Sequence, residues 1–502
     1  MKTLKYLILF SVITYSFTGC IAPSLSSYEP PYALEATKGI VDEGTAELAL
    51  TGLYAQFRKN DGEGMPYMFF VPEAMGAYCD PAYYDFYIRK DPQYVGMCNN
   101  SPVASGNNFF LNGIYTGMYK LVNKANWIVQ EVSKIDATSF SRVERKNEII
   151  AEARMMRALG YFYLLRLYGE FYDVNSEYGL DIRKTPAMDA TPYPRKSVGE
   201  VYDFILEDLE YGISDGPTVS ARYFTNIGFA KGMKAKVLLY MGRYAEAKAA
   251  AKDLIDKHSN NFSLCSTASI FLPHTSRAIY DSPEVLFGTH SGDDRELEAL
   301  AYGSCANYFI DGINANYEAL IKGSTVIGGR TFLHDGGERI SMLIPSYMGP
   351  GIFSTQKFLD SWEGYEMIYH LRMSEVYLIL AEASARAAGA VDTDALNALN
   401  DLRTARGATN NGGDGFEIYP AGLDLNIFLE LVRKEKAIEL ILEGGESWFD
   451  LVRYDYADGF DKGFKASDIK PTATDYHKFI FPIPQKSLDV SEGIIKQNPS
   501  YL

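Results

Sequence analysis

Three carboxylates near the C-terminal end of the chain have the residue type and spacing that glycoside hydrolysis could use: Glu443, Glu446 and Asp450. Glycosidases use one Asp or Glu as general acid and another as base or nucleophile, and only their separation in space is diagnostic. Asp450 also stands three residues before Arg453, a spacing typical of an ion pair on a helix face. We therefore interpret the set as structural, with a surface glycoside hydrolase as the less favoured alternative.

Other catalytic patterns are missing from the sequence. The six histidines are scattered, without a His-x-x-x-His pair or a neighbouring Cys pair, so no zinc site is predicted. There is no Gly-x-Ser-x-Gly elbow, phosphate loop or dinucleotide fingerprint. Residues 410–415 (NNGGDG) lack the spacing of a calcium-binding EF-hand and predict a turn. The sequence thus predicts a protein that is not an enzyme and holds no metal or cofactor.

The first twenty residues carry a different kind of chemistry. Lys2 and Lys5 precede a short apolar run, which ends in Thr18-Gly19-Cys20. The run is shorter than the roughly 20 apolar residues that span a bilayer, and it is typical of a secretory signal. Thr-Gly-Cys resembles a bacterial lipobox, in which the cysteine thiol is acylated and the peptide is cut just before the cysteine. We expect a signal peptide over residues 1–19, lipid on Cys20 and a Pro- and Ser-containing tether over residues 20–40.

The composition is that of an ordinary folded protein, with 47% hydrophobic and 22% charged residues. The net charge of −16 and the lack of a long basic run argue against nucleic acid as a partner. Tyrosine is unusually abundant, with 37 residues, and its amphipathic ring suits a sugar-binding or peptide-binding face. Outside the cytoplasm, Cys79, Cys98, Cys265 and Cys305 could form disulfides or remain thiols, and the sequence leaves both open.

Helical patterning dominates from about residue 42 onward. The apolar spacing predicts helices over residues 113–135, 149–168, 198–213 and 229–241. Two pairs have the form of a tetratricopeptide hairpin, in which a short glycine turn joins two helices: 229–241 with 248–258, and 373–387 with 393–406. The pattern predicts helical hairpins packed side by side.

Two long segments break this pattern and are rich in aromatic residues. Residues 60–112 and 260–365 read as irregular loops. Long irregular segments in a compact helical protein are more often functional than accidental. We therefore place the candidate ligand platform on them: Tyr78, Tyr83, Tyr84, Tyr87, Tyr94, Tyr302, Tyr308, Tyr347 and Trp362.

Five motifs, taken in order, resemble the SusD/RagB family. Residues 152–169 (EARMMRALGYFYLLRLYG) and 194–198 (PRKSV) are similar to two of its successive helices. Residues 371–383 (LRMSEVYLILAEA) and 400–407 (NDLRTARG) follow in the family's order. The chain closes with FPIP and QNPSY, as family members do. The resemblance runs from about residue 40 to the last residue.

Three positions depart from the family pattern. The family's EGxRWFDLxR reads EGGESWFDLVR at residues 443–453, with one extra residue and no arginine before Trp448. Ser500 replaces the usual glycine of the closing motif, and no acidic cluster follows Cys20. The first departure bears on a helix junction, and the last on display at the cell surface.

The resemblance implies a mainly α-helical fold with four tetratricopeptide-like hairpins and large irregular loop regions. It divides the chain into an N-terminal helical region, 41–260, and a C-terminal region, 261–502, interlocked in one body. We assign the motif residues Glu152, Arg157, Glu375, Trp448 and Asp450 to structure.

The resemblance also implies a function and partners. The protein would be an outer-membrane lipoprotein, lipid-anchored and exposed at the surface, that captures oligosaccharides for a SusC-like TonB-dependent transporter. A subunit that captures peptides, as in RagB-like importers, would have the same sequence features, because tyrosines serve both ligands. A scaffold that binds only its transporter is a further alternative.

Overall fold

The computed structural model describes residues 39–58, 67–81, 92–102, 109–189, 191–272, 277–290, 310–344, 346–349, 352–355, 357, 367–412, 415–460 and 462–501. These residues form a mainly α-helical protein, as predicted. Cys20 and the predicted signal and tether lie outside the described residues, apart from residues 39 and 40.

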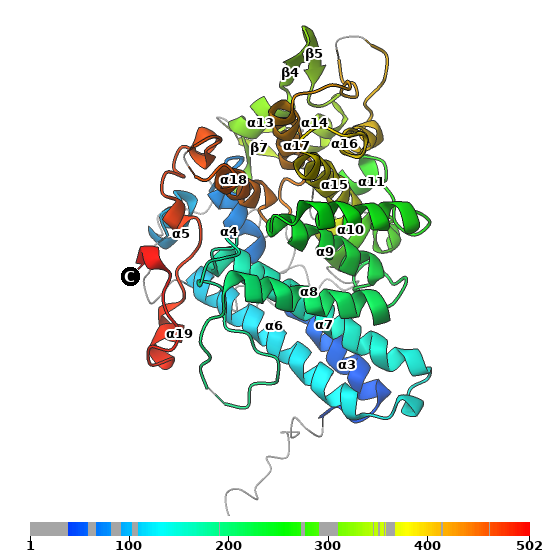
Figure 1. Cartoon of the computed structure of the whole chain (residues 1–502), viewed down its shortest axis with the longest axis vertical. Coiled ribbons are helices and arrows are strands. Elements are labelled where there is room, and N and C mark those ends of the chain that lie inside the picture. The colour runs from blue at the N-terminus through cyan, green and yellow to red at the C-terminus, as the bar shows by residue number, and fades with distance from the viewer. Residues whose placement is uncertain are drawn as a thin grey trace, which may run out of the picture.

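Long helices stack in hairpins along most of the molecule (Figure 1). In chain order they are α3 (Glu43–Tyr54), α6 (Phe109–Lys134), α7 (Val143–Tyr168), α8 (Val198–Asp215), α9 (Ile227–Tyr240), α10 (Tyr244–Lys257), α15 (Met373–Ala388), α16 (Thr393–Ala405), α17 (Leu425–Glu439) and α18 (Glu446–Ala457). Each of α6 to α9 packs on the next, α10 packs on α15, and α15 packs on α16 and α17. All the helices predicted from apolar spacing are present.

Glycine turns close two of these hairpins, as predicted. Gly242 (φ 72°) joins α9 to α10, and Gly389 (φ 63°) joins α15 to α16. A Cβ atom at either position would meet nothing within 4 Å, so the left-handed backbone, not space, is what requires glycine. Asp392 then caps α16 through its carboxylate, which accepts from the Ala395 amide.

Helix α7 is more deeply buried than one apolar face would indicate. Every residue from Ile149 to Tyr168, except Arg154, is buried, because α6, α8 and α3 all pack against it. Gly160 permits the close approach of α6, since a Cβ there would lie 2.8 Å from Leu121. Charges on this helix are neutralised inside the core, as where Arg157 pairs with Asp208 at 2.7 Å.

The two segments expected to be irregular contain short elements instead, and in this respect the prediction was wrong. The first holds α4 (Tyr67–Met75), β1 (Cys79–Pro81) and α5 (Pro92–Cys98). The second and its continuation hold α11 (Ala268–Phe271), β2 (Val285–His290), β3 (Ile310–Asn314), α13 (Ala315–Ile321), β4 (Ser324–Ile327), β5 (Arg330–Leu333), α14 (Glu338–Leu343), β6 (Ser346–Gly349), β7 (Ile352–Ser354) and β8 (Met367–Arg372).

These strands pair with partners that local patterning could not reveal. One sheet has the order β1-β3-β7-β6, and β2 pairs with β8, all antiparallel. Two pairings join strands that are neighbours in the sequence: β4 with β5, around Gly328 and Gly329, and β6 with β7. Elements from both sides of residue 260 pack together: α10 on α15, α4 on α18, and β1 on β3.

The C-terminal segment folds back onto the end of α7. It contains η7 (Ala466–Asp468), η8 (Tyr476–Lys478), α19 (Gln485–Val490) and η9 (Pro499–Tyr501). The buried Asn498 side chain donates to the carbonyl of Tyr168 at 3.0 Å and to that of Phe481 at 2.7 Å. Its oxygen accepts from Arg195 at 2.8 Å. The closing motif thus joins three distant segments through one amide side chain.

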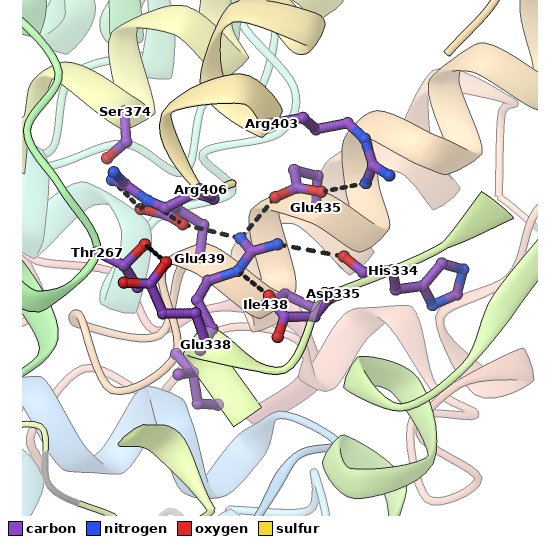
Figure 2. Close-up of polar contacts among 12 residues, drawn as sticks. Thr267, His334, Asp335, Glu338, Ser374, Arg403, Arg406, Glu435, Ile438 and Glu439 are labelled. Carbon is purple, nitrogen blue, oxygen red and sulfur yellow. Dashed lines mark hydrogen bonds and ion pairs between the residues drawn. The ribbon is translucent and has the colours of Figure 1, made fainter. Parts of the chain in front are cut away.

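A buried charge network joins the C-terminal elements. Glu439 of α17 accepts from Arg339 (2.9 Å), Arg372 (2.6 Å) and Arg406 (2.7 Å), which come from α14, the end of β8 and the end of α16. Its neighbour Glu435 pairs with Arg339 at 2.6 Å and with Arg403 at 3.2 Å (Figure 2). Burial alone would raise the pKa of Glu439, but the surrounding guanidinium groups hold it well below its usual range.

We predict that Glu439→Gln lowers the free energy of unfolding by about 3–5 kcal/mol, because three guanidinium groups lose a buried counter-charge. Urea unfolding followed by circular dichroism measures this. Glu246→Gln is the matched control, since that carboxylate is 56% exposed and pairs with the exposed Arg243, so its loss should cost less than about 1 kcal/mol. Equal losses in the two variants would contradict the assignment.

Candidate functional site

The three carboxylates considered for hydrolysis are buried and paired with cations. Asp450 lies 2.7 Å from Arg453 and 3.1 Å from Lys436, which confirms the predicted ion pair. Glu446 lies 2.7 Å from Lys236 and also contacts Arg166, while Glu443 lies 2.8 Å from Arg372. Burial opposes ionisation of Glu446, but these cations lower its pKa far below the usual value. The set therefore forms structural ion pairs.

The other polar motif residues also lie in the core. Glu152 is buried between Arg145 (2.8 Å) and the hydroxyl of Tyr54 (2.7 Å), and burial raises its pKa to about 7. Glu375 contacts Lys236 at 2.8 Å, and Trp448 is fully buried with its ring 5.3 Å from Phe479. These contacts agree with the structural role assigned to them.

Across the described ranges, no group of three or more His, Cys, Asp or Glu side chains is placed to hold a metal ion. No helix of this part of the chain has the length and apolar character to cross a membrane. Cys79, Cys98 and Cys265 are in the thiol form, and Cys305 lies outside the described residues.

The predicted tyrosine platform is described only in part. Tyr78 and Tyr94 are buried, with 6% and 0% of their surface exposed, so they serve as packing groups in this structure. The Tyr78 ring stands edge-on to Tyr317, with 6.1 Å between centroids. Tyr347 lies on β6, opposite Phe353 of β7. The remaining candidates lie outside the described residues: Tyr83, Tyr84, Tyr87, Tyr302, Tyr308 and Trp362. The platform as a whole therefore stays a prediction.

The four-stranded sheet brings the two aromatic segments to one place. Pro81, at the end of β1, pairs with Ile310, at the start of β3. Directly paired residues of antiparallel strands lie roughly 4.5–5.5 Å apart at Cα. The end of β1, two positions before Tyr83 in the sequence, therefore lies beside the start of β3, two positions after Tyr308. Pro81 and Ile310, more than 200 positions apart in the sequence, are thus neighbours in one sheet, which we call the base of the platform.

Further contacts fix this base to the helices. The Asn314 amide side chain donates to the carbonyl of Ala77 at 3.0 Å, and the Asn314 backbone N–H donates to the carbonyl of Tyr78 at 2.9 Å. The Asn314 side-chain oxygen caps α13 by accepting from the backbone of Asn316 and Tyr317. One residue thus joins β1, β3 and α13.

The segment that departs from the family pattern, residues 443–453, contacts α4, the helix that precedes β1. Gly444 (φ 79°) and Gly445 (φ 80°) adopt left-handed backbone directly before α18. A Cβ at Gly445 would lie 2.1 Å from that of Pro72 in α4, so only glycine fits. The Gly445 amide donates to the Glu73 carboxyl at 2.8 Å. The extra residue does not interrupt α18, and α4 packs against the start of that helix.

Glu73, in the contact between α4 and α18, makes the stability of the fold depend on pH. Burial raises its pKa to about 8, although the Gly445 amide and Lys357 oppose the rise. In the unfolded chain, the Glu73 carboxyl is protonated only below about pH 4.3. Between pH 5 and 8 the folded state therefore binds more protons than the unfolded state. The contribution of Glu73 to stability is therefore present at low pH and is lost as the pH rises through 8.

We predict that Glu73→Gln gains stability relative to the unsubstituted protein as the pH rises from 5 to 8, because glutamine cannot ionise. Urea unfolding of both proteins at pH 5, 6.5 and 8 measures the difference. A difference that does not change with pH would show that Glu73 does not titrate in this range.

A cavity of about 330 Å³ lies between α6, residues 181–192 and the α19 region. Its lining combines aromatic, polar and aliphatic groups: Tyr115, Thr116, Tyr119, Lys120, Asn123, Arg183, Pro192, Val490 and Ile495. The sequence analysis did not name this site. The i, i+4 spacing of Tyr115 and Tyr119 was its only local signal, and the other walls come from distant segments.

The fold defines a protein of stacked helical hairpins with a small four-stranded antiparallel sheet. Two family models match the chain: the SusD family over residues 345–501, and "Starch-binding associating with outer membrane" over residues 80–226. Together they cover more than half of it. The chain is thus SusD-like in both of these regions.

Individual curated relatives match only part of this chain. A SusD-like protein of Bacteroides ovatus is 33% identical over 129 residues, which are 26% of this chain and 22% of that protein. SusD-like protein P38 of Formosa agariphila is 26% identical over 179 residues, or 35% of this chain and 32% of that protein. The matched stretches therefore span about a fifth and a third of these curated relatives.

Solved structures extend the similarity to nearly the whole fold. A putative sugar binding protein of Bacteroides vulgatus superposes with a TM-score of 0.71 at 20% identity, covering 92% of this chain and all of that one. A SusD superfamily protein of Bacteroides thetaiotaomicron gives 0.68 at 21% identity, with 91% and 100% covered. A laminarin-binding SusD-like protein gives 0.66 at 18% identity, with 92% and 100% covered.

Proposed function

We propose that this chain is a non-catalytic lipoprotein of the outer membrane that captures oligosaccharides and delivers them to a SusC-like TonB-dependent transporter. The observation that carries the proposal is the pairing of Pro81 with Ile310, which gives both aromatic segments a common base. The family descriptions and the laminarin-binding relative support a glycan as the ligand. Burial of Glu443, Glu446 and Asp450 in ion pairs supports binding without hydrolysis.

Capture of a sugar requires several rings acting together. Sugars present apolar C–H faces and hydroxyl groups, which match flat aromatic rings accompanied by amide or guanidinium groups. One ring contact contributes on the order of 1 kcal/mol, whereas association costs roughly 4 kcal/mol or more. We therefore expect dissociation constants from about micromolar to millimolar. Such weak binding suits a protein that must release its cargo to a transporter.

We predict that replacing Tyr83, Tyr84 and Tyr87 together by alanine weakens glycan binding at least tenfold. Affinity electrophoresis of the purified full-length chain through gels containing laminarin, starch or other polysaccharides measures this as lost retardation. Thr116→Trp is the matched control, because it fills the 330 Å³ cavity from an exposed position and leaves the platform unchanged.

The outcomes separate the alternatives. If Thr116→Trp loses retardation and the tyrosine variant keeps it, the glycan site lies in the 330 Å³ cavity. Calorimetric heat with a peptide pool alone would favour a peptide importer, and release of reducing sugar would favour a glycoside hydrolase. If no tested polysaccharide or peptide binds, the result would favour a scaffold that binds only the transporter.

The proposed anchor is tested separately. We predict that Cys20→Ala moves the protein from the outer-membrane fraction to the soluble extracytoplasmic fraction, because one thiol is the proposed site of acylation. Fractionation with immunoblotting measures this, and metabolic labelling with an alkyne fatty acid should label only the unsubstituted protein. Cys265→Ala is the control, and unchanged membrane attachment in Cys20→Ala would contradict the anchor.

A further inference from the structure

A second, larger cavity lies away from the aromatic platform and has a different chemistry. It encloses about 660 Å³ between α17, the end of α18 and residues 462–469. Arg386 and Arg433 line it together with the rings of Tyr454 and Phe464. Helices α15, α17 and α18, which supply three of these four residues, pack on one another (Figure 1).

Arg433 is exceptional among the buried arginines. Its surface is 7% exposed, and no carboxylate of the described residues lies within ion-pair distance of it. The other buried arginines are paired with carboxylates, as Arg372 is with Glu439, with the exception of Arg222. Arg222 donates to three backbone carbonyls instead. A guanidinium removed from water without a counter-charge is costly, so Arg433 is ready for an external anion.

Aromatic rings hold both guanidinium groups in place. Arg433 lies over the Phe464 ring at 4.5 Å, and Arg386 lies over the Tyr454 ring at 4.7 Å. The two rings are themselves in edge contact, with 6.3 Å between centroids. Arg386 is further fixed by Glu382, which accepts from its Nε at 2.8 Å. The cavity therefore offers fixed donors beside flat apolar surfaces.

The carboxylates around this cavity are engaged elsewhere. Glu430 pairs with Lys434 at 2.6 Å. Asp458 accepts from the Phe464 amide at 2.9 Å, and Asp468 accepts from the Lys465 amide at 3.0 Å. Glu430 and Asp468 are exposed, so water screens their charge, whereas the guanidinium of Arg433 is buried. Arg433 is thus the buried charge of this lining, whereas the lining carboxylates Glu430, Asp458 and Asp468 are exposed.

We propose that this cavity binds the acidic unit of a saccharide, with Arg433 and Arg386 holding its carboxylate or sulfate group and the rings of Phe464 and Tyr454 contacting the sugar. Guanidinium groups suit such planar or multidentate oxyanions, and aromatic rings suit the C–H face of the sugar. The inference rests on the proposed capture of glycans and names a charge class for the cargo.

The cavity is also connected to the base of the platform. Tyr78, directly before β1, is buried, which raises its pKa, and a hydrogen bond from Arg433 opposes that rise. An anion bound by Arg433 would therefore lie one side chain away from Tyr78, the residue directly before β1. The acidic-sugar site and the platform would then engage neighbouring parts of one glycan.

Calorimetry with methyl β-glucuronide and methyl β-glucoside on the purified full-length chain tests the proposal, since the two sugars differ only at the carboxylate. We expect the glucuronide to bind at least tenfold more tightly, and this preference to fall at least tenfold in Arg433→Gln. Arg243→Gln, which removes an exposed guanidinium elsewhere, should leave it unchanged. Glucose 6-sulfate and inorganic sulfate then distinguish an acidic sugar from any oxyanion.

A second variant keeps the test decisive if Arg433→Gln fails to fold. Asn426→Trp fills the cavity from an exposed position of α17 and keeps both arginines, so it should also abolish glucuronide binding. Equal binding of the two sugars, or glucuronide binding that survives in both variants, would overturn the inference.

The capture function is judged by a separate result. Retardation by a neutral polysaccharide without glucuronide binding would leave capture standing and overturn the acidic-sugar site. Glucuronide binding that depends on Arg433, without retardation by any polysaccharide, would retain the site and overturn capture.

Discussion

Three guanidinium groups on one buried carboxylate, Glu439, are the interaction on which the C-terminal half of the structure depends. Arg339, Arg372 and Arg406 reach Glu439 from α14, β8 and the end of α16. Because each charge is costly when left without its partner, these elements must assemble together or not at all. The network leaves few alternative ways to pack β8 and α17, and α17 packs on α13 and lines the 660 Å³ cavity.

The molecule thereby separates a rigid frame from the parts that bind. Stacked hairpins need only apolar faces, glycine turns and internal ion pairs to pack, and a few of their remaining side chains line the two cavities. The β1-β3-β7-β6 sheet then gathers the origins of the aromatic segments at one edge of that frame. A frame of this kind lowers the entropy cost of ordering a binding surface, which matters for a ligand that gains little from each contact.

Charge is used in two different ways. In the core, opposite charges cancel in closed networks, as in the contacts of Glu446 with Arg166 and Lys236. In the 660 Å³ cavity, Arg433 and Arg386 lie on aromatic rings, and the acidic groups at its entrance bind other donors. Closed networks stabilise the fold, whereas Arg433, which has no carboxylate partner among the described residues, is the group proposed to bind a ligand.

The sequence by itself determined helices α6 to α10, α15 and α16, the glycine turns and the Asp450–Arg453 ion pair, because each depends on residues a few positions apart. Only the tertiary structure decided the pairing of Pro81 with Ile310, the walls of both cavities and the partners of Glu439. These contacts join segments tens to hundreds of residues apart, and no local periodicity encodes which distant strand or charge will be the partner. The short strands of the aromatic segments were missed for the same reason, since their stability comes from pairing across the fold and not from their own residues.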